Sequence, residues 1–169
     1  HFFSNRCGVY SSFAGMGIRA NLIRSNVFEG RSRLSSDGIF MQAVGNRISE
    51  NLFRTCKRYA AYLESSNIAL RNTFVSNSNI SSLHLAGRGA MAISNWIFGN
   101  SIQDVGIFIL NSQISVAGNY ITGERFWGIH VPGPSSNIVF RNILVSNWIS
   151  GVHLDNNARN HSIISNSFD

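Results

Sequence analysis

The stretch that decides the fold is Asn95-Trp96-Ile97-Phe98-Gly99-Asn100-Ser101-Ile102-Gln103-Asp104-Val105-Gly106-Ile107-Phe108-Ile109. Its first anchor is Asn95, which is followed two positions later by the apolar Ile97. Its second anchor is a small residue, Gly106, followed by an apolar–variable–apolar triplet. A short alternation of this kind has the period of two expected of a β-strand. The stretch therefore predicts short strands separated by turns.

The asparagine anchor recurs along the whole chain at a nearly constant step. The steps lie between 21 and 25 residues and average 23. The anchors are Asn5, Asn26, Asn51, Asn72, Asn95, Asn119, Asn142 and Asn166. A period of this length is typical of a solenoid, in which each repeat is one coil stacked on the previous one.

The second anchor keeps the same period. Its small residues are Gly17, Gly38, Ala60, Ser82, Gly106, Gly128 and Gly151. The positions two residues after each asparagine form a nearly all-apolar column, namely Cys7, Phe28, Phe53, Phe74, Ile97, Ile121, Leu144 and Phe168. We therefore expect three short strands in each coil, with a tight turn at the asparagine and two looser turns.

The asparagines have a structural role in this interpretation. A tight bend between strands needs a residue at positive φ, which Asn tolerates better than other non-glycine residues. Amides stacked about 4.8 Å apart, the spacing of neighbouring strands, can form a hydrogen-bonded ladder along the axis.

The repeated Asn-x-(Phe/Ile)…Gly-Ile-x-Leu pattern resembles that of the right-handed parallel β-helix of the pectin-lyase-like superfamily. The resemblance covers essentially the whole chain and implies one all-β domain, residues 1–169, of about seven coils of ~23 residues. It does not fix a reaction, because the superfamily includes pectate and alginate lyases, polysaccharide hydrolases, uronate epimerases, phage tailspikes and adhesins.

The charge of the chain suggests an anionic partner. Only 13% of residues are charged, yet the net charge is +6, with thirteen arginines and a single lysine, Lys57. Residues 1–90 carry a net +7 and residues 91–169 a net −1. No basic run or nucleic-acid motif accompanies this charge. We therefore expect an acidic polysaccharide as the partner, and no nucleic acid.

Other features bear on the context of the chain. It has no apolar run long enough to span a bilayer. It starts at His1 and both ends lie inside a repeat, so we expect a piece of a longer solenoid whose caps lie elsewhere. Cys7 and Cys56 lie two coils apart, too far to form a disulfide.

One exterior column is unusual for a solvent-facing strand. The outward positions of the second anchor are Arg19, Phe40, Tyr62, His84, Phe108, His130 and His153. The resemblance implies that substrate lies along this strand, and planar rings can stack on sugars. We therefore predict substrate-binding roles for Arg19, Phe40, Glu64, Phe108, His130, His153 and Asp155. Two alternatives stay open: the column is covered by a neighbouring subunit or segment, or it stabilises itself by stacking.

Within this column, Tyr62 and His84 on adjacent coils form the predicted catalytic cluster. Lyases and epimerases acting on uronates need a cation near the substrate carboxylate, together with a base and an acid. Lys57 or Arg58 would neutralise the carboxylate, while His84 and Tyr62 would share the acid and base roles.

A second cluster consists of His130, His153 and Asp155. It could orient an imidazole as a general base, or bind a metal through two histidines and one carboxylate. Because no further ligand is apparent, we expect no metal and no cofactor, and the sequence does not support Ca²⁺. A hydrolase pair of nearby carboxylates is also not apparent, since Glu64 and Asp155 are four coils apart, about 19 Å at the usual strand spacing.

Three functions follow from the sequence. The first is a lyase or epimerase acting on an acidic polysaccharide. The second is a trimeric, glycan-binding tailspike-type module, and the third is a non-catalytic β-helical spacer of an adhesin. Each predicts a location outside the cell: secreted, on a cell surface or on a virion.

Overall fold

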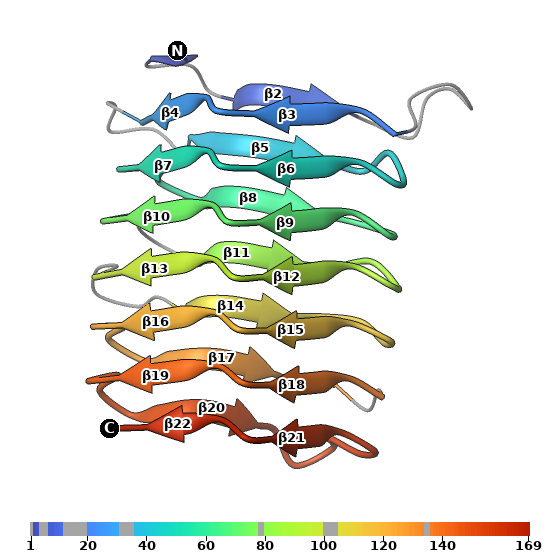
Figure 1. The fold of residues 1–169 in the computed structure, drawn as a ribbon, viewed down its shortest axis with the longest axis vertical. Helices are drawn as coiled ribbons and strands as arrows, with labels where there is room; N and C mark the ends of the chain where they lie inside the picture. Colours follow the sequence, from blue (N-terminus) through green and yellow to red (C-terminus); the bar gives the residue numbers. More distant parts are fainter. Residues whose placement is uncertain are drawn as a thin grey trace.

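The computed structural model describes residues 2–3, 7–11, 20–30, 36–77, 80–99, 105–133 and 136–169. These residues form 22 strands in three parallel sheets, and no α-helix. Each coil contributes one strand to each sheet, and the coils stack along one axis with the two ends of the chain at opposite ends of the stack (Figure 1). The right-handed parallel β-helix is thereby confirmed. No helix in the described part of the chain could span a membrane.

The three sheets, called A, B and C here, differ in strand length. Sheet A contains β1 (Phe2–Phe3), β4 (Val27–Glu29), β7 (Leu52–Arg54), β10 (Thr73–Val75), β13 (Trp96–Phe98), β16 (Tyr120–Thr122), β19 (Ile143–Val145) and β22 (Ser167–Phe168). Sheet B contains the five-residue strands β2 (Cys7–Ser11), β5 (Asp37–Met41), β8 (Tyr59–Leu63), β11 (Ser81–Leu85), β14 (Val105–Ile109), β17 (Trp127–Val131) and β20 (Ser150–Leu154). Sheet C contains β3 (Leu22–Arg24), β6 (Arg47–Ser49), β9 (Ile68–Leu70), β12 (Met91–Ile93), β15 (Ser115–Ala117), β18 (Ile138–Phe140) and β21 (Ser162–Ile164).

The core is built from columns of like side chains. The predicted apolar column of sheet A is buried from Phe28 to Leu144, with each member at most 1% exposed. The Phe53 ring is stacked between Phe28 and Phe74, with centroids 4.8 Å away on each side. Parallel pairing in register places equivalent residues directly above one another, so one position of the repeat becomes one column of the core.

The first coil differs from the predicted register. Cys7 was expected in the apolar column of sheet A, but it opens β2 of sheet B, opposite Asp37. Phe2 is the residue that pairs with Phe28. Gly8 supplies the small residue of this coil: a Cβ there would lie 2.7 Å from both the Phe28 ring and the Gly38 carbonyl oxygen. Close packing therefore requires a small residue at Gly8.

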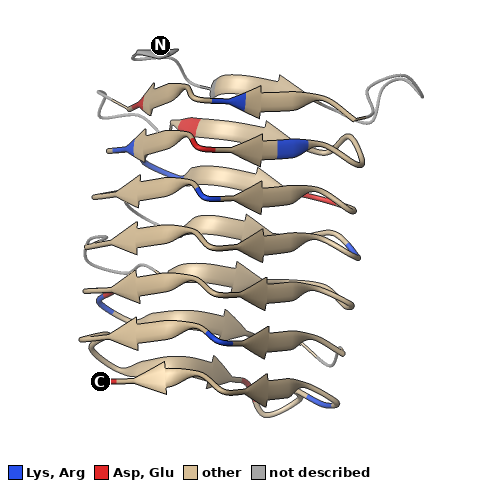
Figure 2. Ribbon diagram, viewed as in Figure 1, with Lys and Arg blue, Asp and Glu red and all other residues tan. Residues whose placement is uncertain are grey.

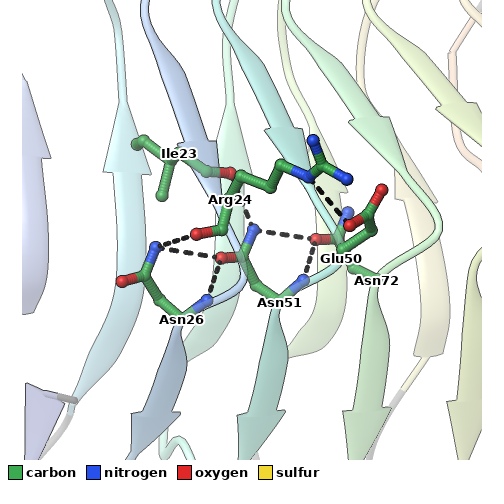
Figure 3. Close-up of polar contacts among 6 residues, drawn as sticks. All are labelled: Ile23, Arg24, Asn26, Glu50, Asn51 and Asn72. Carbon is green, nitrogen blue, oxygen red and sulfur yellow. Dashed lines mark hydrogen bonds and ion pairs between the residues drawn. The ribbon is translucent and has the colours of Figure 1, made fainter.

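The asparagine ladder is present from Asn26 to Asn166. Asn72 is typical: its backbone N–H and its side-chain Nδ2 donate to Asn95 Oδ1 at 2.9 and 3.1 Å, and Nδ2 also donates to the Ile48 carbonyl at 2.9 Å. Figure 3 shows the same pattern at Asn26 and Asn51. Asn5 lies outside the described residues.

The predicted backbone of this turn is wrong by one residue. Positive φ falls on the residue before each ladder asparagine, at values between 52° and 62°, in Ser25, Glu50, Arg71, Ser94, Gly118, Arg141 and Ser165. The asparagine itself must direct its amide inward along the axis, so the preceding residue takes the strained conformation.

A second asparagine ladder lies at the turn before sheet C. Asn21 Nδ2 donates to Asn46 Oδ1 at 2.9 Å, and Asn46 Nδ2 donates to Asn67 Oδ1 at 3.1 Å. Further along the axis, Asn137 Oδ1 accepts from the Ile114 N–H at 2.8 Å. The sequence analysis missed this ladder, because apolar residues interrupt its column between Asn67 and Asn137.

Candidate functional site

The exterior of sheet B holds the predicted site residues. In β5, β8, β11, β14 and β17, the second and third residues are both buried, as are Ala60 and Ala61 in β8. Consequently the first and fourth residues, Tyr59 and Tyr62, both lie on the outer face, where their rings are 5.2 Å apart. The outer face is therefore wider than a simple period of two predicts.

The central column of this face is a continuous row of rings. Successive centroids are 4.4 to 5.4 Å apart, in the order Tyr10, Phe40, Tyr62, His84, Phe108, His130 and His153. The rings from Tyr10 to Phe108 are nearly parallel, with interplanar angles of at most 17°. Stacked pairs of this kind each contribute roughly 0.5–1.5 kcal/mol beyond their area burial.

Tyr10 occupies the position that the sequence analysis gave to Arg19. Tyr10 pairs with Phe40 in the register of β2 and β5 and is 65% exposed. Arg19 itself lies outside the described residues, so its substrate-binding role stays a prediction.

The predicted catalytic pair, Tyr62 and His84, is brought together, with ring centroids 5.0 Å apart. The Tyr62 hydroxyl donates to Glu64 Oε1 at 3.1 Å, and Glu64 also accepts from Gln42 Nε2 at 3.1 Å. Burial, together with this hydrogen bond and the carboxylate charge, raises the pKa of Tyr62 to about 12.

His84 is almost completely enclosed, at 5% exposure, and its Nδ1 lies 3.3 Å from the Ser81 hydroxyl. Burial lowers the pKa of His84 to about 4, so the ring is neutral at pH 7. General acid–base catalysis is most effective when the pKa of the group lies near the working pH. The catalytic roles of Tyr62 and His84 stay a prediction.

The cation of the predicted cluster already has an anionic partner. Arg58 forms a two-point ion pair with Asp37, in which Nε lies 2.9 Å from Oδ1 and the second contact joins an Nη to Oδ2. The guanidinium also lies over the rings of Phe40 and Tyr59, at 5.8 and 5.2 Å from their centroids. The backbone N–H of Lys57 donates to the Ser36 carbonyl at 2.9 Å.

His130, His153 and Asp155 form a compact cluster near the other end of sheet B. His130 Nε2 lies 2.9 Å and His153 Nε2 lies 3.1 Å from the same oxygen, Asp155 Oδ1. The side chain of His130 is 10% exposed, whereas those of His153 and Asp155 are 38% and 40% exposed. The hydrogen bond from His130 holds the pKa of the Asp155 carboxyl below its usual range.

Trp127 is the member of this cluster that the sequence analysis missed. Its ring is stacked on His153, with centroids 4.3 Å apart and planes 8° apart, and lies 4.3 Å from the His130 ring. The Trp127 Nε1 and His130 Nδ1 atoms are buried and have no hydrogen-bond partner among the described residues. The signal was the residue before each small anchor, a position that Tyr59 and Trp127 hold and that the register aligns with Ser81 and Ser150 in the neighbouring strands.

The donor set of this cluster suits a transition-metal ion. Two imidazoles and a carboxylate are ligands that first-row divalent ions accept. Ligands bonded at ~2.0–2.1 Å to one ion are about 3 Å apart, which matches the two separations from Asp155 Oδ1. The ligand atoms of His130, His153 and Asp155 all lie within 4.8 Å of one another. Binding requires that the Nε2 protons leave and that neutral imidazole keeps its proton on Nδ1.

Comparison with known proteins identifies a family for this chain. A family model described as "Periplasmic copper-binding protein (NosD)" matches residues 3–169. No curated protein and no solved structure matches the chain. The matched range includes every described residue of the aromatic column and of the histidine–aspartate cluster.

Proposed function

The chain belongs to the NosD family, and from this membership we propose that it binds a copper ion through His130, His153 and Asp155. The observation that supports the proposal is the convergence of two Nε2 atoms on one carboxylate oxygen, at 2.9 and 3.1 Å. The family description names both copper and the periplasm. We therefore also propose a periplasmic location for this chain, in preference to a cell surface or a virion.

The chemistry of the three residues favours copper among the divalent ions. Imidazole suits copper, zinc and nickel, and Cu²⁺ stands highest in the usual affinity order of first-row divalent ions. The low pKa of Asp155 keeps its carboxylate charged and able to bind a cation well below neutral pH. The side chain of His130 is nearly buried, which limits its movement. The side chains of His153 and Asp155 are partly exposed, so an ion can reach them from solvent.

This arrangement suits reversible binding better than permanent retention. Three protein ligands leave coordination positions for water or for a group from another molecule. An ion held partly by exposed side chains can leave without unfolding of the coil. We propose a carrier or storage role for the site.

Copper binding is tested by titrating metal-free protein with copper(II) sulfate at pH 7. We expect one tightly bound ion per chain, with quenching of tryptophan fluorescence because Trp127 is stacked on His153. Electron paramagnetic resonance should show coupling to two imidazole nitrogens, which falls to one in His153→Ala. His153→Ala and Asp155→Asn should bind at least tenfold more weakly.

His161→Asn is the matched control, because it removes a histidine from the next turn and leaves the cluster intact. His161 Nδ1 lies 3.3 Å from the Asn137 backbone nitrogen, where the second ladder has asparagine in other coils. This variant should bind copper as the natural chain does. Equal binding by the natural chain and by His153→Ala, or no binding by either, would overturn the proposal.

A second candidate function is sugar binding along the aromatic column. The row of parallel rings from Tyr10 to Phe108 favours it, because planar rings can stack on sugar faces. The pairing of Arg58 with Asp37 favours binding without lyase cleavage or epimerisation. Affinity electrophoresis in gels containing uronate polymers should show retardation that Tyr10→Ala reduces. Formation of unsaturated product, lost in Tyr62→Phe, would instead support an enzyme.

The homotrimer and the larger parent chain also stay proposals. The solution mass of the protein, measured over a range of concentrations, tests the trimer.

A further inference from the structure

A hollow on the sheet C side of the solenoid is lined mainly by arginine. Its volume is about 340 Å³, and its lining residues are Leu22, Arg24, Arg47, Ser49, Glu50 and Arg71. Figure 2 shows the basic segments on β3, on β6 and in the turn after β9, with an acidic segment in the turn after β6. The volume lies at the lower end of the range of small-ligand sites.

The register of sheet C brings these residues together from three successive coils. Leu22 pairs with Arg47, and Arg24 pairs with Ser49. Neighbouring coils are about 4.8 Å apart. Arg24 and Arg47 are diagonal neighbours on adjacent strands, so their long side chains are within reach of each other. Arg71 follows β9 at the position that Glu50 holds one coil earlier, and both have positive φ, at 52° and 55°.

The positive charge of the hollow is only partly balanced. Arg24 Nε lies 2.8 Å from Glu50 Oε2, as Figure 3 shows. Within the described ranges, no acidic side chain forms an ion pair with Arg47 or Arg71. The lining therefore carries one ion pair and two further guanidinium groups.

Guanidinium groups without an acidic partner favour ligands that carry carboxylate or phosphate groups. The planar fork of arginine matches the geometry of carboxylate and phosphate, and bidentate contacts to either are among the stronger hydrogen bonds. The backbone N–H of Arg71 donates to the Ile93 carbonyl at 3.0 Å, which fixes the position of this turn. Leu22, 58% exposed at the edge of the hollow, offers apolar surface to the body of a ligand.

We infer that this hollow binds a ligand with two oxyanionic groups, carboxylate or phosphate, one held by Arg47 and the other by Arg71. Arg24 and Glu50 form the wall between the two positions. The site lies on sheet C, whereas the proposed copper site lies on sheet B near the C-terminal end. The two sites can therefore be tested separately.

Calorimetric titration of the whole chain at low ionic strength tests the inference with two probes, trigalacturonate and inorganic pyrophosphate. We expect saturable binding of at least one probe, and the affinity should fall as salt is added, because the attraction is between charges. Arg47→Gln and Arg71→Gln should each weaken binding at least tenfold.

Arg141→Gln is the matched control. Arg141 is exposed, has a φ of 52° and occupies the same position of the turn as Arg71, three coils further along. It loses the same charge but lies outside the hollow, so binding should change at most twofold. Circular dichroism and copper binding should be unchanged in all three variants, which would show that they fold.

The outcomes separate the ligand classes and the alternatives. Tighter binding of trigalacturonate assigns the site to an acidic sugar, and tighter binding of pyrophosphate assigns it to a phosphate-bearing ligand. Equal weakening by Arg71→Gln and Arg141→Gln would mean a diffuse attraction to surface charge and would overturn the inference. Failure of both probes to bind would overturn it as well.

Discussion

At the scale of single residues, the ladder asparagine is a fully buried and fully hydrogen-bonded side chain, as Asn95 shows. Asn95 accepts two hydrogen bonds from Asn72 and donates to Asn119 Oδ1 and to the Ala69 carbonyl, with no exposed surface. Every polar atom of its amide thus has a partner inside the solenoid. Only asparagine and glutamine have an acceptor and a two-proton donor in the same planar group, and the side chain of asparagine is the shorter one.

Replacing Asn95 by alanine should therefore be costly. The change leaves the buried Asn72 N–H without its acceptor and removes one donor from the Ala69 carbonyl, and an unsatisfied buried group costs about 1–3 kcal/mol. We expect a loss of about 2–4 kcal/mol in the free energy of unfolding, measured by urea denaturation. Asn166→Ala, at a half-exposed position where water can replace the amide, should cost less than about 1 kcal/mol. Similar losses in both variants would contradict this account.

His84 should make the stability of the protein depend on pH. Burial lowers its pKa from 6.5 to about 4 in the folded protein, so the unfolded chain binds a proton first as the pH falls. The contribution of neutral His84 is complete above pH 6.5 and is lost between about pH 6.5 and 4, by up to about 3 kcal/mol. His84→Phe, which can still stack between Tyr62 and Phe108, should flatten this part of the curve of unfolding free energy against pH. An unchanged slope would show that other groups cause it.

Residue chemistry explains what could be predicted at this scale. The ladder from Asn26 to Asn166 could be predicted, because side-chain amides that recur at a nearly constant step along the chain are stacked in successive coils. The positive φ of Ser25 and Arg71 was not identifiable, because neither residue type favours it. The pairing of Arg58 with Asp37 across adjacent coils depends on side-chain reach, which spacing alone does not give.

At the scale of elements, the five-residue strands of sheet B decide what the outer face presents. With a strict period of two, the first residue of a sheet B strand, such as Tyr59 or Trp127, would point inward. Both residues lie on the outer face instead, because the two residues that follow each of them point inward. The small residues Gly38, Ala60 and Gly106 make this local departure feasible. The column of small residues could be recognised in the sequence. The outward direction of the preceding residue, such as Tyr59 or Trp127, follows only from the backbone geometry.

The turn after β11 should be sensitive to a single methyl group. A Cβ at Gly87 would lie 1.6 Å from the Ser65 backbone nitrogen in the neighbouring coil, so Gly87→Ala must displace one of the two turns. We expect a loss of about 1–3 kcal/mol, seen as a lower melting temperature. Gly133→Ala is the control, because its Cβ would meet nothing closer than 3.9 Å. An equal loss at Gly133 would refute steric contact between turns as the cause.

At the scale of the whole molecule, repetition explains both the success and the failure of prediction. Each coil repeats the same inward positions, so the sequence of each coil gives separate evidence for the same fold. A wrong assignment in one coil, such as that of Cys7, does not change the assignment of the others. In the part of the chain that the structure describes, a cluster like that of His130, His153 and Asp155 occurs once. Its residues were visible in the sequence, but their convergence on one oxygen is a property of rotamers and of the packing of Trp127.

The stacking of coils along one axis also has a mechanical consequence. The two ends of the described chain lie at opposite ends of the stack, and the hydrogen bonds between coils run along that same direction (Figure 1). A force applied between the ends therefore loads the terminal bonds first and peels the coils off in succession. Each released coil of about 23 residues should lengthen the tether by about 75–80 Å. Optical tweezers should record a staircase of such steps, and a single rip of the whole length would contradict it. In such an experiment, the solenoid would unfold one coil at a time, starting from its ends, while the remaining coils stay folded.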